Sequence, residues 1–161
     1  TFRRQILPLA FDLAKALDEV QWSDRLDPYN HHPFFPTGFT TIWDTAPIYV
    51  ATPRDSAINR LLYQPKYKNC VFKLQLAITF QCQIVYFSAL HLGTAHDGLI
   101  FRNTADEHPF LPWEWGLADK IYQAEEHLLI SCRKPRNGEL SLEQQAASSK
   151  LDTARSSVAR V

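Results

Sequence analysis

Apolar and polar residues alternate most regularly between residues 71 and 80. One face of an extended chain there is apolar and carries Phe72, Leu74, Leu76, Ile78 and Phe80. Such a period of two predicts a β-strand. Residues 83–90 predict a second strand, and Gln81 and Cys82 between the two lie near a turn. We therefore expect an antiparallel hairpin.

Two further segments predict strands. Residues 38–51 are rich in β-branched and aromatic side chains, and we expect Pro47 to interrupt or end the regular part of this strand. Residues 116–119 predict a short strand that ends at Asp119. Polar or proline-containing stretches between the elements predict long loops, at 24–37, 53–69 and 104–115.

Three segments predict helices. Residues 3–20 repeat their apolar positions at nearly 3.6 residues. Residues 97–103 predict a short helix after the hairpin. Residues 141–160 predict a third helix, with Ser141 as the N-cap of a weak capping box.

The order of these elements predicts an α/β fold in which helices pack on a mixed sheet. We divide the chain into an N-terminal helix and loop, residues 1–35, and a main domain, residues 36–161. With 161 residues, 45% of them hydrophobic, the chain is long enough to bury a core.

Charge and cysteine content limit the classes of function and of binding site that the chain can have. The formal net charge is zero, whereas a dedicated duplex-binding domain is usually basic, so any contact with nucleic acid must use local patches. The three cysteines form no CxxC pair and predict free thiols rather than a disulfide framework or a zinc site. No apolar run is long enough to predict a transmembrane helix.

Two aspartates are candidates for chemistry. Asp44 interrupts an apolar strand, where aspartate is uncommon. Its structural interpretation is a hydrogen bond to a neighbouring turn. Asp119 follows the short strand, and its structural interpretation is a cap on the next segment. Taken singly, each aspartate favours the structural interpretation.

Four sequence motifs that occur in order favour a catalytic interpretation of the two aspartates instead. They are Asp44-Thr45, the segment from Tyr63 to Lys68, the group Gly93, His96 and Asp97, and the pair Asp119 and Tyr122. Over about residues 36–161 the chain resembles the catalytic core of Harbinger- or PIF-type transposases and the DDE endonucleases derived from them. The resemblance implies a ribonuclease H-like fold, DNA as the substrate and a nuclear location.

The resemblance also implies a metal-dependent mechanism. Three carboxylates from separate elements hold two divalent ions, Mg²⁺ or Mn²⁺, which promote attack on a phosphodiester bond. Asp44 and Asp119 would be two of these catalytic metal ligands. Hard carboxylate oxygens suit such ions.

The third acid of the family is a glutamate on a helix late in the sequence of the domain. We assign this role to no residue of the present chain. In one alignment with the family, residues 158–161 match the segment just before this glutamate. In another alignment, Ala159 stands at the position of the glutamate. The chain begins at Thr1 and has no methionine. We therefore expect a piece of a longer protein, with its domain incomplete at the C-terminus and inactive in isolation.

A second interpretation stays open. The chain would then be a domesticated or degenerate transposase remnant that binds DNA or protein without cutting. A partner protein could supply DNA binding in either case, since no helix-turn-helix precedes Asp44.

Overall fold

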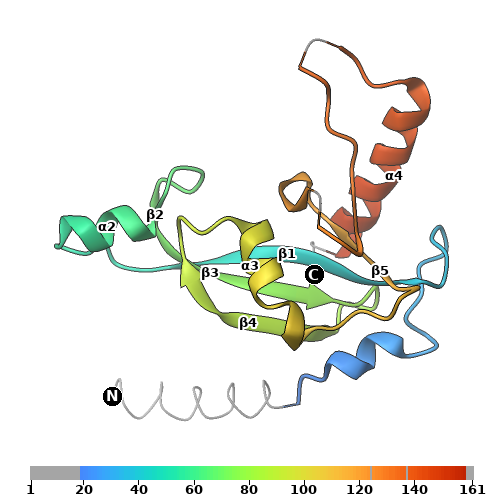
Figure 1. The fold of residues 1–161 in the computed structure, drawn as a ribbon, viewed down its shortest axis with the longest axis horizontal. Helices are drawn as coiled ribbons and strands as arrows, with labels where there is room; N and C mark the ends of the chain where they lie inside the picture. The colour runs from blue at the N-terminus through green and yellow to red at the C-terminus, as the bar shows by residue number, and fades with distance from the viewer. Residues whose placement is uncertain (1–18, 124, 137, 159–161) are drawn as a thin grey trace.

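The computed structural model describes residues 19–123, 125–136 and 138–158, and a mixed sheet forms the centre of the fold (Figure 1). Its strands are β1 (Phe39–Tyr49), β2 (Tyr63–Gln64), β3 (Asn69–Ile78), β4 (Ile84–Leu92), β5 (Trp115–Ala118) and β6 (Leu128–Ile130). Their order is β4-β3-β1-β5-β6, and β2 pairs with the beginning of β3. The hairpin β3–β4 is antiparallel to β1 through β3, whereas β5 and β6 run parallel to β1. The predicted α/β class is confirmed.

The helices and single turns lie between and after the strands. They are η1 (Trp22–Leu26), α2 (Ser56–Leu62), α3 (Asp97–Asn103), η2 (Ala105–Glu107), η3 (Lys120–Tyr122) and α4 (Leu142–Val158). The predictions of α3 and α4 are confirmed. Ser141 and Gln144 exchange the two hydrogen bonds of a capping box, at 3.2 and 3.0 Å. The helix predicted at residues 3–20 falls almost entirely outside the described residues.

The structure differs from the sequence-based expectation in one connection and in one strand. Residues 53–69, expected as a loop, contain α2 and β2, and Asp55 begins α2 by accepting hydrogen bonds from the next turn. Strand β1 continues through Pro47 to Tyr49. Because β5 pairs with β1 only as far as Trp43, no strand among the described residues lies beside Pro47 on that side, and the missing N–H of Pro47 leaves no pairing partner there without a donor.

The two faces of the sheet bury different clusters. Because side chains alternate along a strand, Trp43 and Ala118 point to one face while Ile42 and Leu117 point to the other. The first face packs against α3 and η3, and the second against α4. Figure 1 shows the long connection after β6 leading away from the sheet and α4 returning toward it. None of the helices among the described residues has the length and apolar character needed to cross a membrane.

The apolar face of β3 is not its more buried face. Lys73 and Gln75 are 6% and 0% exposed, whereas Leu74 and Leu76 are half-buried. The reason is that α3 covers the face that carries the polar residues. Helix α3 also supplies them with hydrogen-bond partners.

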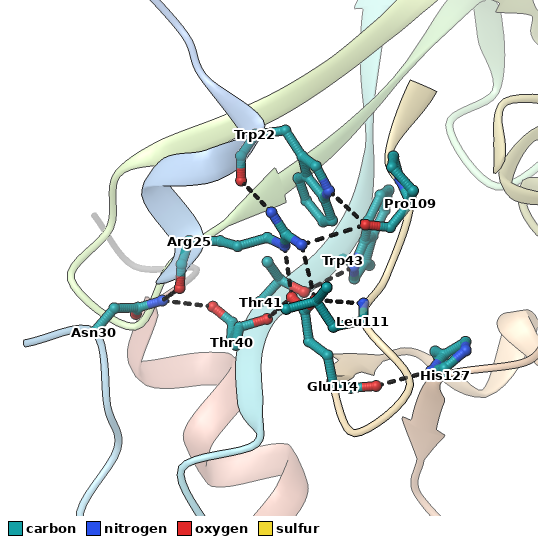
Figure 2. Close-up of polar contacts among 10 residues, drawn as sticks. All are labelled: Trp22, Arg25, Asn30, Thr40, Thr41, Trp43, Pro109, Leu111, Glu114 and His127. Carbon is teal, nitrogen blue, oxygen red and sulfur yellow. Dashed lines mark hydrogen bonds and ion pairs between the residues drawn. The ribbon is translucent and has the colours of Figure 1, made fainter. Parts of the chain in front are cut away.

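A buried ion pair fixes η1 to the sheet (Figure 2). Arg25 donates from Nε and Nη2 to the two oxygens of Glu114, at 2.6 and 2.9 Å, and the Glu114 side chain is fully buried. Glu114 also accepts hydrogen bonds from the Thr40 hydroxyl at 2.5 Å and from the backbone N–H of Leu111 at 3.0 Å. Part of the segment before residue 36 is thus tied to β1 and to the loop before β5. The domain boundary at residue 36 stays a prediction.

Candidate functional site

The two candidate aspartates lie at matching positions on neighbouring strands. Trp43 of β1 pairs with Ala118 of β5, and Asp44 and Asp119 are the next residues along these parallel strands. Neighbouring strands are about 4.8 Å apart. Both aspartates line one small cavity of about 60 Å³. The structure therefore brings together the two acids that the sequence singles out.

Each aspartate accepts a hydrogen bond from the residue after it. Asp119 thereby caps η3 as its structural interpretation expected, whereas Asp44 bonds to the next residue of its own strand and not to a neighbouring turn. Asp44 Oδ1 accepts the backbone N–H of Thr45 at 2.8 Å, and Asp119 Oδ1 accepts that of Lys120 at 2.6 Å. These bonds orient the two carboxylates. Within the described part of the chain, the Oδ2 atom of each carboxylate has no hydrogen-bond partner. Both side chains are accessible, and 46% of the Asp119 side chain is exposed.

A third carboxylate lines the same cavity but is already neutralised. Asp97, the first residue of α3, accepts a hydrogen bond from Lys73 Nζ at 2.7 Å. Lys73 also donates to the carbonyl of Ala95 at 2.6 Å, and both charged side chains are nearly buried. Asp97 is therefore engaged in a structural ion pair, and Lys73 points inward instead of offering its charge to solvent.

A hydrogen-bond network behind the two acids connects β1 to η3. The hydroxyl of Tyr122 lies 2.9 Å from the Thr45 hydroxyl and accepts from Gln75 Nε2 at 3.0 Å. Thr45 and Tyr122 are the residues that accompany the two acids in the sequence motifs. The network therefore fixes the chain directly after Asp44 relative to the chain after Asp119.

The hydroxyl of Tyr122 is neutral around pH 7. Burial raises its pKa above the usual value, the charges of Asp97 and Asp44 add to the rise, and the hydrogen bonds with Thr45 and Gln75 act in the opposite direction. A neutral hydroxyl can accept the hydrogen bond from Gln75 and still either donate to Thr45 or accept from it.

Helix α4 places a cation beside Asp119. The Nη1 atom of Arg155 lies 3.6 Å from Asp119 Oδ1 and 3.6 Å from Asp152 Oδ1. Asp44, Asp152 and Arg155 line a second cavity of about 180 Å³. Arg155 is not among the site residues predicted from the sequence. Its only signal was the i,i+3 spacing from Asp152, which does not reveal the face of α4 that meets the sheet.

The chemical type of the available ligand atoms suits a divalent ion. Carboxylate oxygens are the ligands that Mg²⁺ and Mn²⁺ prefer, and Asp44 and Asp119 present them at one sheet edge. Among residues 19–123, 125–136 and 138–158, however, no group of three or more acidic, histidine or cysteine side chains is arranged to hold a metal ion. Two acids would bind the ion more weakly than a complete set.

Comparison with known proteins identifies a family. Residues 43–161 match a family model described as DDE superfamily endonuclease, so the match begins one residue before Asp44 and includes Asp119. No curated protein and no solved structure matches the chain significantly. Proteins of the matched family generally use divalent metal ions.

Proposed function

Because the chain belongs to the DDE superfamily endonuclease family, we propose that it is the core of a metal-dependent nuclease acting on phosphodiester bonds of DNA. We propose Asp44 and Asp119 as its catalytic metal ligands. The observation that carries this proposal is the position of the two acids, one residue beyond paired positions of adjacent parallel strands and in one cavity.

The chemistry follows from the residues at this edge. A bound divalent ion would supply positive charge to an attacked phosphate and its leaving oxygen. Asp44 and Asp119 would hold the ion through their accessible oxygens. The bond between Thr45 and Tyr122 would keep the two ligands at a fixed separation. A rigid support of this kind is what a site needs to hold its reacting groups in line.

Lys66 is well placed to meet the DNA backbone. It is exposed in the loop between β2 and β3 and lines the cavity that contains both acids. It also lines a larger neighbouring cavity of about 340 Å³ with Asp44 and Tyr67. A lysine at this position would contact a phosphate without reading the sequence, which fits a chain whose overall charge is zero.

Four finer assignments belong to the same proposal. We propose a ribonuclease H-like arrangement, which the strand order β4-β3-β1-β5-β6 supports. We propose the Harbinger or PIF subtype, supported by the motifs around Asp44, Asp97 and Asp119. A nuclear location follows from DNA as the substrate, and Mg²⁺ is the proposed ion.

Metal-dependent DNA binding tests the proposed function. Anisotropy of a labelled DNA duplex would be measured with the chain in Mg²⁺ and in chelator, at constant ionic strength. Free Mg²⁺ normally weakens protein–DNA contacts by competing for phosphates. We nevertheless expect Mg²⁺ to strengthen binding by at least about threefold, because an ion held by the protein joins it to a phosphate.

The double variant Asp44→Asn with Asp119→Asn is the matched comparison. It should lose this strengthening and keep only the metal-independent part of the affinity. The same response to Mg²⁺ in the double variant, or no strengthening in the unaltered chain, would contradict the proposal.

A further inference from the structure

Arg155 brings a permanent positive charge to the proposed metal ligands. Its Nη1 atom is 3.6 Å from both Asp119 and Asp152, and 19% of its side chain is exposed. A guanidinium stays protonated at all accessible pH values. Asp119 is therefore partly neutralised by the protein itself, which lowers the attraction of this carboxylate for any other cation.

The guanidinium is held by charge rather than by a complete set of hydrogen bonds. Both distances to the carboxylates exceed those of a good N–H···O bond. The Nε atom of Arg155 is buried and has no hydrogen-bond partner within the described part of the chain. Arg25 provides a contrast, since its guanidinium forms two short bonds to Glu114. Arg155 therefore binds Asp119 and Asp152 more weakly than Arg25 binds Glu114, and it is easier to displace.

A cavity next to Arg155 connects it to Asp44. The cavity of about 180 Å³ is bordered by Arg155 and by the carboxylates of Asp44 and Asp152. Asp119 lines the neighbouring cavity of about 60 Å³ with Asp44, and it is the proposed ligand that Arg155 contacts. Asp152 Oδ1 also accepts a hydrogen bond from the Ser131 hydroxyl at 2.5 Å, so Asp119 is the carboxylate for which an ion and the guanidinium would compete.

We propose that Arg155 competes with the divalent ion for Asp119 and so determines the metal affinity of this chain. The inference rests on the proposed function of Asp44 and Asp119. With Arg155 paired to Asp119, the site is closed to metal, and the observed affinity is reduced by the fraction of molecules in this state. Binding of the ion moves the guanidinium away from Asp119. Arg155 is thus a positioning residue on α4 and takes no part in bond cleavage.

Titration with Mn²⁺ alone, followed by electron paramagnetic resonance, tests the competition. We expect Arg155→Gln to bind Mn²⁺ about three- to tenfold more tightly, the range for losing one or two partly exposed ion pairs. Arg155→Lys keeps the charge and should lie between Arg155→Gln and the unaltered chain. Arg54→Gln removes an equal charge from an exposed position away from these cavities, and its Mn²⁺ affinity should stay unchanged.

A second readout uses the unaltered chain, so it does not depend on a variant that folds. The Nε–H resonance of Arg155 in nitrogen-15 spectra should shift as Mg²⁺ is added, with the midpoint of metal binding. An unshifted resonance at saturating Mg²⁺ would overturn the inference. So would an Arg155→Gln affinity equal to or weaker than that of Arg54→Gln.

The two proposals fail in different ways. If Asp119→Asn weakens Mn²⁺ binding while Arg155→Gln does not strengthen it, the metal site stands and the competition is refuted. If neither Asp44→Asn nor Asp119→Asn changes Mn²⁺ binding, the proposed site itself is refuted, and the role of Arg155 with it. If Arg155→Gln weakens binding of the DNA duplex but leaves Mn²⁺ binding unchanged, Arg155 is a phosphate contact and the competition is refuted.

Discussion

Substitution of Asp119 by asparagine is expected to weaken Mn²⁺ binding by at least about tenfold, because it removes one unit of charge next to a divalent ion in a partly exposed site. Asp44→Asn should have a similar effect. Asparagine keeps the size of the side chain and its carbonyl still accepts the N–H of the next residue, as both aspartates do. The loss would therefore report on charge and metal ligation rather than on local folding. Isothermal titration would measure it.

Asp106→Asn is the matched control for these two variants. Asp106 is exposed in η2 and lines none of the cavities that contain Asp44. Its substitution makes the same change in net charge and should leave Mn²⁺ affinity within error of the unaltered chain. An equal loss in all three variants would show that Mn²⁺ responds to overall charge, and the assignment of the two ligands would be wrong.

The largest loss of stability is expected for Glu114→Gln. The substitution leaves the guanidinium of Arg25 buried, at 5% side-chain exposure, without its counter-charge. Removal of one partner of a buried pair typically costs about 3–5 kcal/mol of unfolding free energy. Each oxygen of Glu114 accepts two of the four hydrogen bonds from Arg25, Thr40 and Leu111, and glutamine keeps only one oxygen, so two of these bonds lose their acceptor. Urea unfolding followed by tryptophan fluorescence would measure the change.

Glu139→Gln is the comparison for this prediction. Glu139 and Lys134 form an ion pair at 3.7 Å in which both side chains are largely exposed. Such a pair contributes about 1 kcal/mol or less, so the variant should unfold almost as the unaltered chain does. Similar unfolding free energies for Glu114→Gln and Glu139→Gln would show that the buried pair does not hold η1 to the sheet.

Local sequence patterns predicted the elements that carry strong periodicity or a motif. The β3–β4 hairpin, α3 and the capping box of α4 are of this kind, because each depends on residues close together in the chain. Strand β6 was missed since three residues are too few to show a period. The short helix α2 was missed because prolines on either side indicated a loop.

Which face of β3 is covered could not be predicted from alternation. Alternation shows which residues share a face, but the face that becomes buried is decided by elements far away in the sequence. Lys73 meets Asp97, 24 residues later, and Gln75 meets Tyr122, 47 residues later. Both residues are polar, and the structure pairs them in its interior.

Only part of the candidate site could be predicted, because the rest also depends on elements far away in the sequence. The motifs containing Asp44 and Asp119 identified the two acids, and the parallel pairing of β1 and β5 explains why they meet. Glu114 carried no recognisable pattern, and Arg155 had only its i,i+3 spacing from Asp152. Their importance comes from partners that only the packing of α4 and η1 brings within reach.

Anomalous X-ray diffraction from crystals soaked in Mn²⁺ would test the assignment of Asp44 and Asp119 as metal ligands, because it locates the ion without reference to activity. We expect a peak within ligand distance, about 2.0–2.2 Å, of carboxylate oxygens from both Asp44 and Asp119. We also expect the guanidinium of Arg155 to have moved away from Asp119. A peak bound elsewhere, or no ordered Mn²⁺ at these two acids at saturating concentration, would contradict the assignment.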